Sequence, residues 1–224
     1  MILALFLLAF PVGERLEYEA RFSFLNLGIM TLEVKDTMIY EGQHCYVISS
    51  VLNSARSLRF LFSIDDTIDV YTSSAQMLPL LYRERINESG YHRAGNLYFD
   101  REKRTVSYDD SLRIEILEDT RDVLSFWYYL RSVPMDVGDT IRVSVHNAQE
   151  NHDVRCLVKS RQKIKTNAGE YNTILVEPET LGKGIFGAKG GMEIWYSEND
   201  RLPVQIRASM KFGSVLFKLR EVQY

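Results

Sequence analysis

The sequence predicts a mainly all-β fold, an antiparallel curved sheet or an open β-barrel or β-roll of about 12 to 14 strands. Short runs of alternating apolar and polar residues, separated by turn residues, recur along the 224-residue chain. Its 13 Tyr and 11 Phe favour strands, because aromatic rings pack well on pleated surfaces. A single segment, 121–132, breaks this pattern with helical spacing, and we expect it to pack on or in the concave face of the sheet.

The first strands show the alternation clearly. Leu16, Tyr18 and Ala20 share one face of the first run, and the residues between them are charged. A turn is predicted at Asn26–Gly28, and a second alternating run follows at Ile29–Lys35. These two runs predict a hairpin at the start of the domain.

Further strands are expected along the rest of the chain. Their predicted ranges are 45–52, 62–71, 78–87, 91–99, 105–108, 112–117, 140–146, 153–165, 170–177, 192–196, 204–210 and 215–222. No clear period emerges in 53–61, where one or two helical turns are expected. The pattern predicts a meander of neighbouring strands on each side of the helix.

The predicted helix has its own start and stop signals. Thr120 or Asp119 can cap the first turn, Arg131 lies near the negative end of the helix dipole, and Pro134 prevents extension. Four residues fall on one face at helical spacing: Leu124, Trp127, Tyr128 and Arg131. A short helix this rich in aromatic residues has too little polar surface to stand in water, so we expect it to line or plug the concavity.

The chain is expected to form one domain, 11–224, with the helix inserted at 121–132. Residues 1–10 carry no charge and no polar side chain, which is typical of a signal peptide's apolar core or of a truncated leader. The alternative is a buried N-terminal strand. This run is too short to span a bilayer. The pattern predicts an exported protein of the periplasm or cell envelope.

Charge and cysteine usage restrict the partners. With 27 basic and 30 acidic residues the net charge is −3, and no basic stripe is present, which excludes nucleic acid as the main partner. Cys45 and Cys156 would form a disulfide in an exported protein, restraining the unfolded chain by about 4 to 5 kcal/mol. The alternative is two free, half-buried thiols. Their spacing excludes a Cys-X-X-Cys site.

A glycine-rich segment, 182–191, does not match any phosphate-binding motif. Lys189 follows Ala188 where a P-loop needs Gly-Lys-Ser/Thr, and no helix follows. Ile185 and Phe186 lie in this segment. One interpretation is a loop whose Phe packs onto the rim of the sheet. The other is a functional loop, either a flap over a hydrophobic groove or a tip that contacts a membrane surface.

The search for reactive side chains gives no catalytic residue, no metal site and no cofactor. The four histidines lack the spacing of a metal-binding pair, and no nucleophile elbow is present. Asp65 and Asp69 are expected on one face of a strand and Asp66 on the other, so the three carboxylates do not converge. Arg83 and Arg85 are interpreted as a solvated sheet face or a small anion-contacting patch.

Several motifs in a fixed order resemble the bacterial family known as domain of unknown function 3108. They are the opening 12–18, the run 62–66, Leu78-Pro79-Leu80 with Tyr82, the helix 123–131, 164–174 with 176–178, and 194–195 through 202–204. The resemblance covers nearly the whole chain from Pro11. It implies an exported protein of Gram-negative-type envelopes with a curved antiparallel sheet, and it carries over no catalytic residue.

The leading hypothesis is a non-catalytic envelope protein that binds a lipid or another amphipathic molecule, or a glycan or envelope-protein partner, with peripheral membrane contact as a further expectation. The alternatives are an enzyme acting on envelope polysaccharide through acids such as Asp65, Asp66 or Asp69, and a purely structural scaffold. The sequence does not predict an oligomeric state. Seven residues are the candidate ligand-binding set: Phe126, Trp127, Tyr128, Ile185, Phe186, Arg83 and Arg85.

Overall fold

A computed structural model describes residues 10–109, 112–180, 191–210 and 213–224, which form one antiparallel sheet of 14 strands around one α-helix. This confirms the predicted fold class. The elements are β1 (Arg15–Phe22), β2 (Leu25–Tyr40), β3 (Gln43–Ser54), η1 (Arg56–Leu58), β4 (Asp65–Ser73), β5 (Pro79–Glu88), β6 (Tyr91–Asp100), β7 (Thr105–Tyr108), β8 (Arg113–Glu115), α1 (Val123–Ser132), β9 (Thr140–Asn147), β10 (Glu150–Thr166), β11 (Gly169–Thr180), β12 (Met192–Ser197), β13 (Pro203–Met210) and β14 (Gly213–Gln223).

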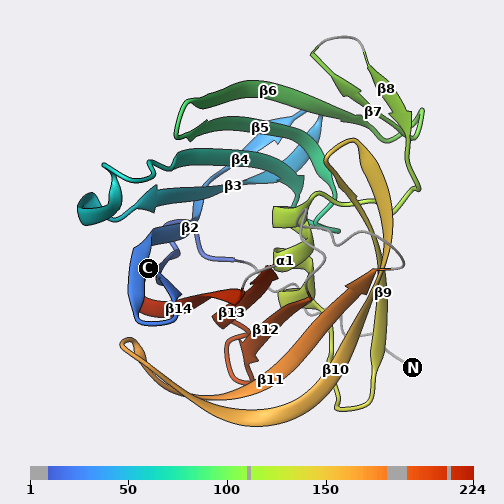
Figure 1. The fold of residues 1–224 in the computed structure, drawn as a ribbon. Coiled ribbons are helices and arrows are strands. Elements are labelled where there is room, and N and C mark those ends of the chain that lie inside the picture. Colours follow the sequence, from blue (N-terminus) through green and yellow to red (C-terminus); the bar gives the residue numbers. More distant parts are fainter. Residues whose placement is uncertain (1–9, 110–111, 181–190, 211–212) are drawn as a thin grey trace.

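The sheet consists of two meanders joined at its centre. Strands β1 to β8 follow one another on one side, β14 back to β9 follow on the other, and β1 pairs with β14. The sheet curls around α1 (Figure 1). Its two outer strands, β8 and β9, do not pair in the described part of the chain, so the barrel remains open.

The first hairpin turns earlier than the sequence predicted. Strand β1 ends at Phe22, Ser23 adopts a left-handed backbone with φ 55°, and β2 begins at Leu25. The predicted turn glycine, Gly28, lies inside β2, where it pairs with Ala20 and Ser54. A Cβ at Gly28 would collide with the Asn53 carbonyl, so this glycine permits close strand approach and does not make the turn.

The helix is shorter than predicted and is buried on most sides. It begins at Val123, and Asp122 caps it by accepting hydrogen bonds from the amides of Leu124 (2.8 Å) and Ser125 (3.1 Å). The predicted caps, Thr120 and Asp119, are therefore wrong. The side chains of Phe126 and Leu130 are fully buried in the main core.

A buried ion pair fixes the helix to the start of the domain. Arg131 donates two hydrogen bonds to Glu14, with Nη1–Oε1 at 2.5 Å and Nη2–Oε2 at 2.8 Å. Its guanidinium also packs against the rings of Phe10 and Tyr128. Burial opposes the charge of Arg131, but the Glu14 carboxylate outweighs it and raises the pKa of the guanidinium.

Side chains join the two outer parts of the sheet at a contact that we call the seam, formed by Tyr108, His146, Asn151 and Glu115. The Tyr108 hydroxyl lies 2.7 Å from Nε2 of His146, and the His146 Nδ1 lies 2.6 Å from the Asn151 amide oxygen. The Asn151 amide group donates to the Glu115 carbonyl at 2.6 Å. His146, expected beside a turn, is therefore a buried member of this contact.

The segment before α1 covers the open edge of β9. The Arg121 amide donates to the Ser144 carbonyl at 2.9 Å, and the His146 amide donates to the Arg121 carbonyl at 2.7 Å. Residue 121, predicted as helical, thus makes a short parallel bridge with β9. Backbone groups that would template another chain are satisfied within this one.

Candidate functional site

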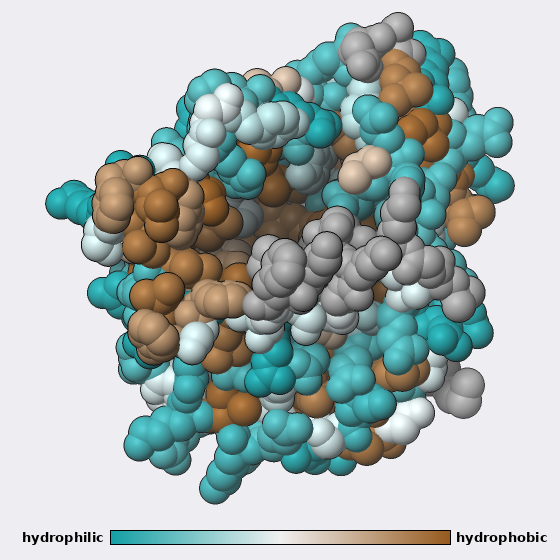
Figure 2. Space-filling model, in the orientation of Figure 1, coloured by the Kyte–Doolittle hydropathy of each residue, from teal (hydrophilic) through white to brown (hydrophobic). Residues whose placement is uncertain are grey.

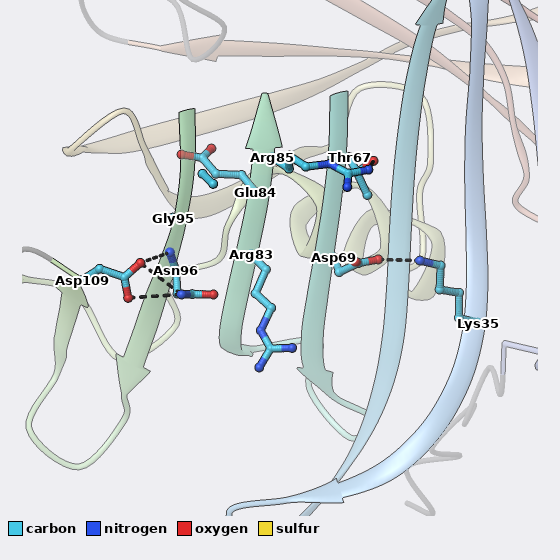
Figure 3. Close-up of a pocket in the computed structure, with 10 residues that line it drawn as sticks. Lys35, Thr67, Asp69, Arg83, Glu84, Arg85, Gly95, Asn96 and Asp109 are labelled. Carbon is cyan, nitrogen blue, oxygen red and sulfur yellow. Dashed lines mark hydrogen bonds and ion pairs between the residues drawn. The ribbon is translucent and has the colours of Figure 1, made fainter. Parts of the chain in front are cut away.

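The candidate site is a groove on the outer face of the sheet, across β4, β5 and β6. Arg83 and Arg85 on β5 point to this face because side chains alternate along a strand. Arg83 lies opposite Asp69 and Asn96, and Arg85 lies opposite Thr67. Figure 3 shows how these side chains are arranged.

The groove has a volume of about 640 Å³. Its lining is mostly polar and comes from four strands and the loop after β7. The lining residues are Lys35, Thr67, Asp69, Arg83, Glu84, Arg85, Ala94, Gly95, Asn96 and Asp109. Ala94 and Gly95 on β6 are small, so this strand leaves open space beside the arginines.

Each carboxylate in the groove already has a partner. Asp69 pairs with Lys35 at 2.8 Å, and Glu84 pairs with Nε of Arg93 at 2.7 Å. Asp109 accepts a 2.7 Å hydrogen bond from the Asn96 amide and two more from the Asn96 side chain. Each carboxylate of the groove is thus bound to a neighbouring side chain or amide of the protein itself.

The two arginines of β5 are held only weakly. Arg83 donates to the Tyr71 hydroxyl at 3.4 Å and packs over the Tyr71 ring at 5.3 Å. Arg85 donates to the Thr67 hydroxyl at 3.4 Å. These distances are at the limit of hydrogen bonding. Among the described residues, neither guanidinium has a carboxylate partner, and both side chains are exposed.

This arrangement can bind an anion. A guanidinium presents several fixed N–H donors that match phosphate and carboxylate oxygens. In Figure 3 the two guanidiniums reach in different directions along the groove, which suits an extended anionic ligand better than one small anion. The described residues contain no group of three or more His, Cys, Asp or Glu that could hold a metal ion.

The sequence profile of the family described as protein of unknown function (DUF3108) matches residues 17–220. The chain belongs to this family. A search of curated protein sequences finds no match for this DUF3108 protein.

The fold of this DUF3108 protein recurs elsewhere. The crystal structure of a β-barrel-like protein of the DUF1849 domain from Brucella abortus matches with a TM-score of 0.65 at 11% identity, covering 95% of this chain and 97% of that one. At this identity the likeness shows the fold alone.

Two further solved structures have lower scores. A candidate exported protein with a YmcC-like fold from Bacteroides fragilis gives 0.45 at 14% identity, covering 96% and 97% of the two chains. A candidate lipoprotein from Parabacteroides distasonis gives 0.41 at 12%, covering 95% and 96%. Scores this low support no conclusion about the DUF3108 chain.

The structure separates the residues that the sequence grouped as ligand-binding. Phe126 and Tyr128 lie inside the packed core, so these rings fill the concavity and do not line an open surface. Trp127 is half-buried against the same core. Ile185 and Phe186 lie outside the described residues. Only the two arginines of β5 lie in the groove.

The disulfide hypothesis is not supported. Cys45 on β3 and Cys156 on β10 are both free and buried, in strands that belong to different meanders. Burial raises the pKa of both thiols, that of Cys156 to about 12. The alternative, two free thiols, is what the DUF3108 structure shows. Both thiols are buried, whereas the sequence predicted them to be half-buried.

Apart from Asp69, which was singled out only as a candidate acid, the other groove residues of this DUF3108 protein were not identified from the sequence. Lys35 and Asp109 lie far from β5 in the chain, and only the strand order and register bring them to the groove. The alternation rule gives the outward faces of β4 and β6, and the predicted meander makes them neighbours of β5, but neither gives the register that sets residues of different strands beside one another.

Proposed function

We propose that this chain is a non-catalytic binding module of the cell envelope that holds an amphipathic envelope molecule by an anionic group, phosphate or carboxylate, in the outer groove. The observation that carries the proposal is the pair Arg83 and Arg85, which lie on one face without a carboxylate partner among the described residues. Charged hydrogen bonds to such groups are the strong ones in proteins.

Placement in the envelope rests on the sequence. The apolar, uncharged run at residues 1–10 and the family resemblance both favour export. In the described part of the chain, no helix has the length and apolar character needed to cross a bilayer.

The polysaccharide-active alternative receives no support from the three acids considered for it. Asp65 and Asp69 share the outer face, and Asp66 points to the inner one. Asp69 is paired with Lys35, and Asp66 accepts a hydrogen bond from the Asn87 amide at 2.9 Å. No two of these carboxylates flank a common space in the way that a glycosidase needs.

Native mass spectrometry of protein purified from its own host tests the proposal. We expect a co-purifying anionic ligand on the unaltered protein and a loss of about tenfold or more in its occupancy in the double variant R83Q/R85Q, since a hydrogen bond to a charged group contributes about 1.5 to 3 kcal/mol.

The matched control is R142Q/R155Q, which also removes two positive charges, from surface arginines on β9 and β10 at the other end of the strand order. It should retain the ligand. Absence of any ligand on the unaltered protein, or equal occupancy in R83Q/R85Q, would overturn the proposal and favour a structural scaffold.

A further inference from the structure

Two neighbouring tips of the sheet carry large apolar side chains in water. Phe24 in the β1–β2 turn is 86% exposed, and Phe60 and Leu61, which follow η1, are 88% and 71% exposed. Leu25 beside Phe24 is 44% exposed. We call these four residues the apolar rim. Phe60 and Phe24 are the most exposed of the large hydrophobic side chains that the structure describes.

The two tips lie side by side. The Ala55 amide, just before η1, donates to the Leu27 carbonyl of β2 at 2.8 Å, and Gly28 pairs with Ser54. Figure 1 shows η1 projecting at the edge of the molecule next to the turn of the blue hairpin. In Figure 2 hydrophobic residues gather over these same elements at the left of the view. The rim is therefore formed by the ends of two neighbouring hairpins.

The η1 tip is a built structure. The amides of Leu61 and Phe62 both donate to the Leu58 carbonyl at 2.9 Å, and the Leu58 amide donates to the Ala55 carbonyl at 2.9 Å. The Ser63 amide donates to the Ser89 hydroxyl at 2.9 Å. These bonds hold Phe60 outward at a fixed place, although burial of such a ring would be favourable.

The segments that form the two tips carry arginines and no acid, and the acids Asp65, Asp66 and Glu88 lie behind the η1 tip. Residues 53–64 contain Arg56 and Arg59 and no Asp or Glu, and residues 20–28 contain Arg21 and no acid, whereas the whole chain has a net charge of −3. Arg21 pairs with Glu19. Among the described residues, Arg56 and Arg59 have no ion-pair partner.

We propose that the apolar rim inserts into the interface of an anionic lipid membrane, with Arg56 and Arg59 contacting lipid phosphates. Aromatic and leucine side chains beside arginines are the composition that binds membrane interfaces, where the apolar part enters the acyl boundary and the cation stays at the headgroups. The combination of exposed apolar side chains with adjacent arginines matches an anionic lipid surface. This proposal does not depend on the groove at Arg83 and Arg85.

Vesicle co-flotation tests the proposal. The purified protein is mixed with vesicles of phosphatidylethanolamine and phosphatidylglycerol, or with vesicles of phosphatidylcholine alone. We expect binding to the anionic vesicles, weakened at high salt because screening shortens the reach of the arginines. The variant F24S/F60S should lose about tenfold or more in partitioning, and R56Q/R59Q should lose its preference for the anionic vesicles.

The matched control is I39S/L117S, which removes two similarly exposed apolar side chains, 63% and 65%, from other elements. It should bind as the unaltered protein does. Because Phe60 is exposed, F60S and F60W are expected to fold, and circular dichroism checks that they do. In F60W the new indole emission should shift to the blue with anionic vesicles and be quenched by brominated lipid.

No flotation with either vesicle type, or equal flotation of F24S/F60S and the control, would overturn the proposal and leave a protein partner as the occupant of the rim. The variant R83Q/R85Q should still float, and F24S/F60S should still retain the groove ligand. Failure of this proposal and failure of the proposed function are therefore distinguishable.

Discussion

His146 shows how one side chain can hold two distant parts of a sheet together. Its Nδ1 faces the amide oxygen of Asn151, whose orientation is fixed by donation to Glu115. Nδ1 must then carry the proton, and Nε2 accepts from the Tyr108 hydroxyl. In the neutral histidine the Tyr108 hydroxyl donates to Nε2; a second proton would reverse this hydrogen bond and place a positive charge in a buried site, which costs free energy.

The seam predicts a pH dependence of stability. Burial is the largest influence on His146 and lowers its pKa from the ordinary value of 6.5, against the opposing hydrogen bond to Asn151. The unfolded chain therefore binds a proton at this position at a higher pH than the folded chain does. We expect the free energy of unfolding to fall as pH drops below about 6.5, by at most about 1.4 kcal/mol per pH unit from this residue.

Urea unfolding at a series of pH values measures this effect. H146Q should have lower stability near neutral pH, because the seam is altered, and a flatter profile below pH 6.5. H92Q, which removes an exposed histidine, is the control. An unchanged profile in H146Q would show that the seam histidine does not cause the acid loss.

At the scale of elements, α1 is positioned by contacts from outside the helix. Glu14 pairs with Arg131 at its end, Asp122 caps its start, and the backbone of Arg121 joins the preceding segment to β9. The sequence predicted an aromatic helix inside a sheet, and that is correct. It did not predict the cap, because Asp119, Thr120 and Asp122 all have side chains able to cap and only the direction of the incoming chain selects among them.

The cap gives a prediction at this scale. Asp122 is fully buried, and burial raises its pKa, although hydrogen bonds from Ser125 and Leu124 act in the opposite sense. Burial thus acts against the charge of Asp122, while the hydrogen bonds to its carboxylate need only an acceptor oxygen. We expect D122A to lose about 1 to 2 kcal/mol of unfolding free energy and D122N, which keeps the acceptor oxygen, to lose less than half of that.

Urea unfolding followed by circular dichroism compares the two Asp122 variants. Equal losses in D122A and D122N would mean that the charge, through the nearby Arg101 and Arg121, matters more than the cap.

At the scale of the whole molecule, the fold is held by packing and by its seam, without a covalent link between the two cysteines. Strand β1 lies at the centre of the sheet, with β2 on one side and β14 on the other. The first and last strands are therefore adjacent, and their pairing joins the two meanders into one sheet.

The free thiols give a prediction for the whole molecule. We expect the midpoint of thermal unfolding to be the same with and without reductant, since a disulfide closing so long a loop would contribute about 4 to 5 kcal/mol. Cys45 and Cys156 should react with iodoacetamide only after unfolding, because both are buried and their thiol pKa values are raised. A lower midpoint of thermal unfolding in reductant would contradict the free-thiol state. A protein mass that is lower by two hydrogen atoms would contradict it as well.

The sequence by itself determined the fold class, the existence of α1 and the outward faces of most strands. These properties are local: a period of two or of 3.6 residues is written in neighbouring residues, and it states which face of an element is buried. The family was likewise visible in the order of short motifs. Arg83 and Arg85 could be named for the same reason, as two charges on one face of a strand.

The contacts between residues that are distant in the chain depend on the tertiary structure. The pairing of β1 with β14, the ion pair between Glu14 and Arg131, and the contact of Tyr108 with His146 join residues far apart in the chain. A periodic pattern indicates which face of a strand is buried, but not which residues of other strands lie beside it. Strand order and register bring Lys35 and Asp109 to the groove. They also place the turn that carries Phe24 next to the η1 tip that carries Phe60. The same cause placed Phe126 and Tyr128 in the core, because a helix enclosed by a curled sheet buries nearly all of its surface.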